Sequence, residues 1–227
     1  MAAKIDTDFL LRETEWLLKK QPLLSYAPFV DNTIVVQGDY HFNGRHEGGI
    51  VIDEVFQLKF VFDITSPYFK PIVYEKSTVI PRDNHHHINS DNSLCLGSEI
   101  ELHLLLRKNP SLKYFVERIL DPFLYKAMLK AKGFASEFIG GELSHGDDGI
   151  LESFRDLLKL KSLDEAHQAI ELICMKKRLA NKKNCPCQCG KRLGKCRLHI
   201  KINELRSLMP RSRFRKLFAP SKLRREG

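Results

Sequence analysis

The spacing of hydrophobic positions changes along the chain and separates a first helical segment from extended ones. Residues 8–20 carry leucines at helical spacing and end in Lys19 and Lys20. This pattern predicts an amphipathic helix whose last turn has the positive charge that a helix dipole favours. Residues 33–40 and 55–64 are instead rich in β-branched and aromatic residues, which predicts two strands of an antiparallel sheet. One face of the second strand is apolar, with Phe56, Leu58, Phe60 and Phe62.

A proline-containing stretch at residues 66–71 interrupts the strands, because proline has no N–H to donate to a sheet. A short strand at residues 72–75 is predicted after it. Residues 79–95 show little periodicity and are rich in His, Asn, Asp and Ser, which predicts an irregular loop. Since loops carry a disproportionate share of catalytic and binding residues, this one is a candidate for chemistry.

Helical spacing returns after this loop. It predicts four helices, at residues 99–107, 112–130, 148–160 and about 163–179. Ser162 is placed to cap the last of them, with Glu165 three residues further on as in a capping box. The order of one helix, about four strands, a polar loop and then helices predicts an α+β fold, in which the helices are segregated from a meander sheet.

Length and composition suit one domain of ordinary size with an appendage, since the chain has 227 residues of which 43% are hydrophobic. We expect a core domain over residues 1–160, a helical linker over 161–182 and a basic, cysteine-rich tail over 183–227. The first residues include acids, and no apolar run reaches the eighteen residues typical of a membrane span. The sequence therefore predicts a soluble, cytoplasmic protein with no membrane partner.

The formal net charge of +9 is unevenly distributed. Residues 1–178 are close to balanced, whereas Lys and Arg far outnumber acids from Leu179 onwards. Such a tail suits nucleic acid or an acidic protein as a partner, although a charge run is more often simply a solvated surface.

Six cysteines divide into three groups. Four of them lie within twelve residues, too close together for ordinary disulfide geometry, and so are predicted metal ligands: Cys185, Cys187, Cys189 and Cys196. Cys174 lies in an apolar helical stretch, which favours simple burial. Cys95 instead follows the polar loop, which contains three histidines upstream of it. A thiolate there would be both a strong nucleophile and a good leaving group.

The loop sequence resembles the active-site motif of ubiquitin-conjugating enzymes. In that family His-Pro-Asn begins a polar stretch, and the catalytic cysteine lies ten residues after the His. Here His85-His86-His87 begins the stretch and Leu94-Cys95-Leu96 ends it, so that His85 matches the first motif position while His86 and His87 replace the Pro and Asn. Residues 66–74 also resemble the family's proline-rich turn and following strand. The likeness covers roughly residues 5–160 and is closest to bacterial members.

This resemblance implies a ubiquitin-conjugating-like fold and a transferase. An activating enzyme would deliver a ubiquitin-like modifier, or another protein with a C-terminal glycine, and Cys95 would hold it as a thioester before transfer to a substrate lysine. A bacterial antiphage or protein-modification system is a plausible setting for such an enzyme. Two other classes stay open: a non-catalytic binding module of the same fold, and a nucleic-acid-binding protein that acts through the tail.

Four further residues are candidates to assist Cys95. In the family, the motif asparagine is thought to stabilise the oxyanion, and here His85, His87 or Asn89 would have to donate that hydrogen bond. Asp91 is placed near enough in sequence to orient or deprotonate the incoming lysine amine.

The cysteine-rich tail resembles a SEC-C type of small zinc motif, in which Cys-x-Cys is followed after eight residues by Cys and then directly by His or Cys. Cys185, Cys187 and Cys196 match, but Arg197 stands at the last position. The fourth ligand would then be Cys189 or His199, and either set would enclose a structural zinc ion in a small zinc knuckle.

Two phenylalanines lie among the cations that follow this motif. Phe214 and Phe218 are four residues apart, with Arg211, Arg213, Arg215 and Lys216 around them. They suit either base stacking in a nucleic-acid site or the apolar face of an amphipathic helix.

Overall fold

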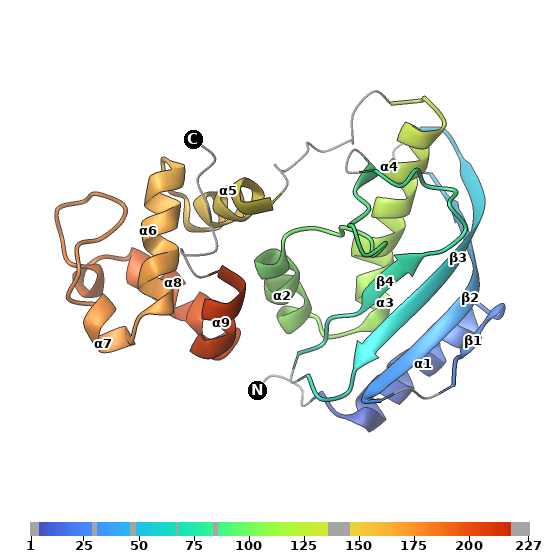
Figure 1. The fold of residues 1–227 in the computed structure, drawn as a ribbon, viewed down its shortest axis with the longest axis horizontal. Helices are drawn as coiled ribbons and strands as arrows, with labels where there is room; N and C mark the ends of the chain where they lie inside the picture. The colour runs from blue at the N-terminus through green and yellow to red at the C-terminus, as the bar shows by residue number, and fades with distance from the viewer. Residues whose placement is uncertain are drawn as a thin grey trace. The chain divides into compact units, whose positions relative to one another are not determined.

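A computed structural model describes residues 5–28, 31–45, 49–66, 68–83, 86–135 and 146–218. The chain forms two compact units, Met1–Glu142 and Leu143–Gly227, which are considered separately below (Figure 1). The domain limits expected at residues 160 and 182 stay predictions. Within the described ranges, no helix has the length and apolar content needed to cross a bilayer.

The first unit has the predicted α+β architecture. An N-terminal helix precedes a four-stranded antiparallel sheet in the order β1-β2-β3-β4, and helices follow the sheet (Figure 1). The elements are α1 (Thr7–Lys20), β1 (Leu24–Tyr26), β2 (Thr33–Gly44), β3 (Ile52–Asp63), β4 (Ile72–Glu75), α2 (Glu99–Lys108), α3 (Leu112–Phe115), the π-helical segment η2 (Val116–Leu120) and α4 (Asp121–Ala131).

One face of the sheet forms the core of this unit. The alternation predicted for β3 is confirmed, since Phe56, Leu58, Phe60 and Phe62 are all buried. On β2, Val36 pairs with Phe60 and Tyr40 pairs with Phe56, so the two strands bury the same face. Side chains from α1, α2, α3, η2 and α4 pack into the same core.

The strand β1 depends on a glycine in β2. A Cβ atom at Gly38 would lie 2.3 Å from the backbone oxygen of Leu23, and the φ of Gly38 is +141°. Both the close approach and the backbone angle exclude ordinary side chains. The pairing of Leu24 with Gly38 therefore requires this residue.

The helix predicted at residues 112–130 is present but contains a π-helical turn. It runs from Leu112 to Ala131 as α3, η2 and α4 without a break. The π turn at Val116–Leu120 lies immediately before Asp121 and Pro122. Because proline cannot donate the regular helical hydrogen bond, the widened turn accommodates it without ending the helix.

The second unit is helical. It comprises α5 (Gly146–Leu158), α6 (Leu163–Cys174), α7 (Lys177–Ala180), the short η3 (Leu193–Lys195), α8 (Leu198–Arg206) and α9 (Arg211–Phe218). The predicted cap of α6 is confirmed, because Ser162 Oγ accepts the Glu165 N–H at 3.2 Å. Glu165 Oε2 in turn accepts the N–H of Lys161 at 2.8 Å.

The helix expected to reach residue 179 ends earlier, at Cys174, and Met175 is extended. Two arginines from later helices account for this. Arg206 Nη2 donates to the carbonyl oxygen of Leu172 at 2.5 Å, and Arg215 Nε donates to that of Cys174 at 3.1 Å. The carbonyls of Leu172 and Cys174 thus accept bonds from guanidinium groups at the point where the helix ends.

Three phenylalanines form the centre of the second unit. The ring of Phe154 lies 6.1 Å from that of Phe214 and 5.3 Å from that of Phe218, and the latter two rings are 5.1 Å apart. All three side chains are buried. The interpretation of Phe214 and Phe218 as base-stacking groups is therefore wrong, because they form the apolar face of α9 instead.

We expect Phe154→Ala to lower the free energy of unfolding of the second unit by about 3–5 kcal/mol, because it removes the ring on which both others pack. Urea denaturation followed by far-UV circular dichroism would measure this. Trp16, the only tryptophan, lies in α1, so its fluorescence reports on the first unit. That fluorescence transition should stay unchanged, as should both transitions in the exposed control Leu179→Ala. An equal shift of the Trp16 transition would contradict separate cores.

Candidate functional site

Cys95 lies between β4 and α2 on a segment attached to the sheet. The N–H of Leu94 donates to the carbonyl oxygen of Val73 in β4 at 2.8 Å, and the N–H of Cys95 donates to that of His87 at 2.8 Å. Leu94 and Ile88 face each other in an isolated bridge and are both buried, whereas Cys95 is partly exposed. Cys95 is therefore a partly exposed residue on a backbone that is anchored to the sheet.

A tight turn before Cys95 brings together Asn89 and Asp91. The Asn89 Nδ2 group donates to Ser93 Oγ at 2.9 Å, and Ser93 Oγ donates to Asp91 Oδ1 at 2.6 Å. The N–H of Ser93 also donates to Asp91 Oδ1, at 2.9 Å. These two bonds, the one from the Ser93 hydroxyl first, hold the pKa of Asp91 below its ordinary value. Asp91 is thus a carboxylate at neutral pH.

The three histidines of the loop before Cys95 differ in what the structure shows of them. His85 lies outside the described residues. His87 has a φ of +56°, a left-handed conformation in which Asn, Asp and His are found more often than other non-glycine residues. A histidine at the motif's asparagine position is therefore compatible with this backbone. The neighbouring His86 is turned toward Asp83, with Nδ1 at 2.7 Å from Asp83 Oδ1.

A buried carboxylate that the sequence analysis missed supports the loop leading to these histidines. Glu75, at the end of β4, is fully buried. Its Oε2 lies 2.9 Å from Arg82 Nη2, and its two oxygens accept the N–H groups of Ser77 at 2.7 Å and of Thr78 at 3.1 Å. Arg82 Nη2 also donates to the carbonyl oxygen of Glu75 at 2.6 Å. Glu75 therefore closes residues 75–82 into a compact turn.

The segment after Cys95 is attached to α2. Ser98 caps this helix, its Oγ accepting the N–H of Glu101 at 3.3 Å. Lys70, from the proline-containing stretch, donates to Glu99 Oε2 at 2.7 Å and so joins that stretch to the first turn of α2. Cys95 is thus placed between two ordered elements, with only three residues separating it from the start of the helix at Glu99.

In the second unit, the four clustered cysteines come together. The sulfur atoms of Cys185, Cys187, Cys189 and Cys196 all lie within 4.8 Å of one another. Their backbone turns tightly, with φ of +55° at Gln188 and +72° at Gly190. Four sulfur donors at this separation can hold a metal ion, as the spacing in the sequence predicted.

The geometry favours Cys189 over His199 as the fourth metal ligand. The ring of His199 donates from Nδ1 to the carbonyl oxygen of Cys196 at 3.0 Å, and His199 does not belong to the group of four. The N–H of Lys191 chiefly lowers the pKa of the Cys189 thiol, to about 7, so this thiol is readily deprotonated. Burial raises the pKa of Cys185 and of Cys187.

Cys174, the remaining cysteine, is buried at the end of α6, and burial raises its pKa. This confirms its predicted structural role. Of the two cysteines outside the group of four, Cys95 is therefore the one that is partly exposed.

Comparison with known proteins found no matching family model, no similar curated protein and no similar solved structure. The likeness to ubiquitin-conjugating enzymes thus rests on the motif around Cys95 and on the order of the elements.

We expect Glu75→Ala to destabilise the first unit by about 1–3 kcal/mol, because it leaves two backbone N–H groups and the Arg82 guanidinium without their buried acceptor. Denaturation followed by Trp16 fluorescence would measure the loss. Asp53→Ala serves as a matched control, since Asp53 pairs with His41 on the surface of the same unit. This control should leave the transition almost unchanged. Equal stability of the Glu75 variant and the wild type would show that the turn does not depend on Glu75.

Proposed function

We propose that the first unit is a ubiquitin-conjugating-like transferase that carries an acyl group on Cys95. The observation that supports this best is the partial exposure of Cys95, which lies on a segment anchored to β4 and is followed after three residues by α2. The order of N-terminal helix, antiparallel meander, cysteine loop and C-terminal helices agrees with the order in ubiquitin-conjugating enzymes. The same order, with the motif from His85 to Leu96, supports assigning their fold to this unit.

The proposed chemistry consists of two acyl transfers. In the first, the Cys95 thiolate attacks the C-terminal glycine carbonyl of a modifier held as a thioester by an activating enzyme, and the activating enzyme's thiol leaves. In the second, a lysine amine attacks the new thioester, an amide forms, and the Cys95 thiolate is released. The modifier is thereby joined to a protein substrate, and the proton that the amine loses passes to solvent.

Groups near Cys95 fit supporting roles in these steps. Asp91, as a carboxylate held by Ser93, suits the orientation of the incoming amine, whereas its lowered pKa makes it a weak base for deprotonation. His87 stands in place of the motif asparagine, and its backbone oxygen is hydrogen-bonded to Cys95 N–H. His87, together with His85 or Asn89, is proposed to supply the donor for the oxyanion. The amide of Asn89 is already engaged with Ser93, which makes it a support for the turn first.

We further propose that the four cysteines bind one structural zinc ion. A set of four thiolates suits tetrahedral zinc and leaves no coordination position for a substrate. Zinc would then tie the turn from Cys185 to Cys189 to the residues before α8. Zinc-bound cysteines, as well as a reduced thiol at Cys95, suit the reducing cytoplasm, the proposed location of the protein.

A transfer test that does not require the natural activating enzyme uses a peptide ending in Gly-Gly, activated as a mercaptoethanesulfonate thioester. We expect Cys95 to become acylated, which intact-mass spectrometry would detect as one added peptide. Dithiothreitol should remove it, and Cys95→Ser should abolish the thiol-sensitive adduct.

Cys174→Ala is the matched control, because it removes the other cysteine that lies outside the group of four. This variant should be acylated like the wild type. An absence of adduct on Cys95, with the thioester still intact in solution, would oppose the transferase and favour a non-catalytic binding module.

Metal analysis of the purified, reduced protein should find about one zinc per chain. We expect Cys189→Ser to lose most of this zinc and His199→Ala to retain it, because Cys189 lies in the sulfur group and His199 does not. Elemental analysis of both variants after gel filtration would measure this. Retention by the Cys189 variant together with loss by the His199 variant would assign the fourth ligand to histidine instead.

A further inference from the structure

The segment that contains the four cysteines is strongly basic and contains no acid. Between Leu172 and Asn203 the sequence has ten Lys and Arg residues and no Asp or Glu. All but Lys201 are exposed, and the nine are here called the basic knuckle surface. They are Lys176, Lys177, Arg178, Lys182, Lys183, Lys191, Arg192, Lys195 and Arg197.

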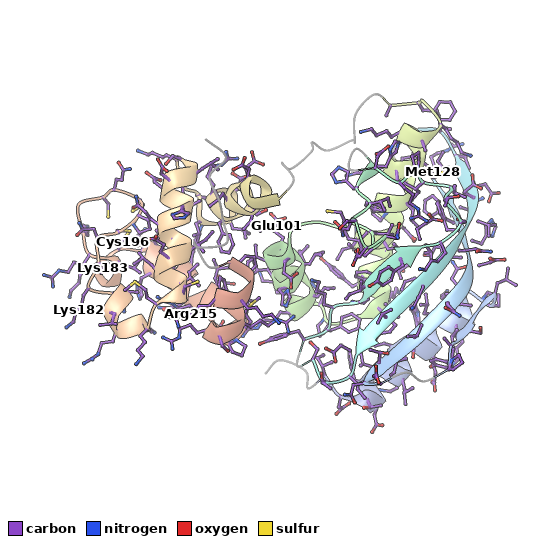
Figure 2. The ribbon with its side chains drawn as sticks, viewed as in Figure 1. Glu101, Met128, Lys182, Lys183, Cys196 and Arg215 are labelled. Carbon is purple, nitrogen blue, oxygen red and sulfur yellow. The ribbon has the colours of Figure 1, made fainter. Side chains whose placement is uncertain are left out.

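Backbone hydrogen bonds bring together two stretches of the chain that carry four of these cations. The N–H of Leu193 donates to the carbonyl oxygen of Lys183 at 2.9 Å, and Asn184 forms a bridge with Arg192. The N–H of Cys185 donates to the carbonyl oxygen of Lys191 at 2.9 Å. Residues 182–185 and 191–193 therefore lie side by side, and their cations share one end of the unit. Figure 2 shows Lys182 and Lys183 at this end, near Cys196.

These charges are not neutralised within the described parts of the chain. None of the ion pairs found there includes a member of the basic knuckle surface. Nine like charges on such a short segment repel one another. A partner that carries many closely spaced negative charges would relieve this repulsion.

The side chains around these cations favour a particular polyanion. Single-stranded nucleic acid is usually held by bases stacked on exposed aromatic rings. From residue 146 to 218 the only aromatic residues are Phe154, Phe214 and Phe218, and all three are buried. Protein partners are usually held by apolar or aromatic anchors, whereas the exposed large apolar side chains between residues 172 and 203 are Leu179 and Ile200 alone. A nucleic-acid duplex can be bound through its dense rows of phosphates, without stacking rings or apolar anchors.

We propose that the basic knuckle surface binds the phosphate backbone of duplex nucleic acid without reading its sequence. Lysine and arginine contacts to phosphates supply this kind of affinity through release of counterions. The four-cysteine turn holds the two basic stretches side by side. This proposal does not depend on the chemistry of Cys95, so the Cys95→Ser variant should bind the duplex as the wild type does.

The test measures binding of the full chain to a fluorescent DNA duplex of about 20 base pairs over a range of salt concentrations. The key variant replaces Lys182, Lys183, Lys191 and Arg192 by Gln. The matched control replaces four exposed cations of the first unit by Gln and so has the same net charge: Arg12, Lys19, Lys20 and Lys108. We expect the key variant to lose affinity by a factor of at least about ten. The slope of its log binding constant against log salt concentration should be smaller in magnitude by about 3–4.

The control variant should keep nearly the wild-type slope, and zinc content should be measured in both variants to establish that the cysteine turn is intact. Equal losses in the two variants, or no binding by the wild type at low salt, would overturn the proposal.

The same measurement is repeated with an RNA duplex. Whichever duplex binds more tightly, DNA or RNA, identifies the type of nucleic acid that the surface binds. Tighter binding of a single strand of the same sequence would also overturn the proposal. Polyglutamate that binds as tightly as the duplex would overturn it too, and would favour an acidic protein as the partner.

Discussion

Burial of one face of the β2–β3 pair is the constraint on which the first unit depends. These strands are long, twelve residues each, and their paired inner positions receive the side chains of the surrounding helices. β4 is only four residues long and obtains its position from β3. The segment before Cys95 in turn obtains its position from β4, through the bond between Leu94 and Val73. The position of Cys95 therefore depends on a series of strand pairings, the first of which is formed by burial of apolar side chains.

Much of this fold could be predicted because each long element has a repeating pattern. The alternation from Phe56 to Phe62 identifies β3, since burial on one side of a strand has a period of two. β1 carries no such pattern in its three residues, and its existence depends on the absence of a side chain at Gly38. The end of α6 likewise could not be predicted from its own pattern, because it depends on contacts with distant residues. It is determined by Arg206 and Arg215, which come more than thirty residues later in the chain.

The candidate sites were predictable to different degrees. The four cysteines are close in sequence, so a single turn brings their sulfur atoms together, and their spacing alone indicated a metal site. The surroundings of Cys95 depend on contacts that are not periodic, such as the hydroxyl of Ser93 between Asn89 and Asp91. Glu75 was not identified because a glutamate at the end of a short strand usually faces solvent. Its burial depends on the cation of Arg82, seven residues further on.

The attachment of the cysteine loop to β4 also changes what the sheet can offer to other chains. An edge strand normally presents unpaired N–H and carbonyl groups, which invite a further strand. Here the carbonyl of Val73 is occupied by Leu94, and Tyr74 forms a bridge with Ser93. The loop thus covers part of this border with the protein's own backbone. A polypeptide that approaches Cys95 from this side would have to be recognised by side chains, because backbone pairing along these residues is already taken.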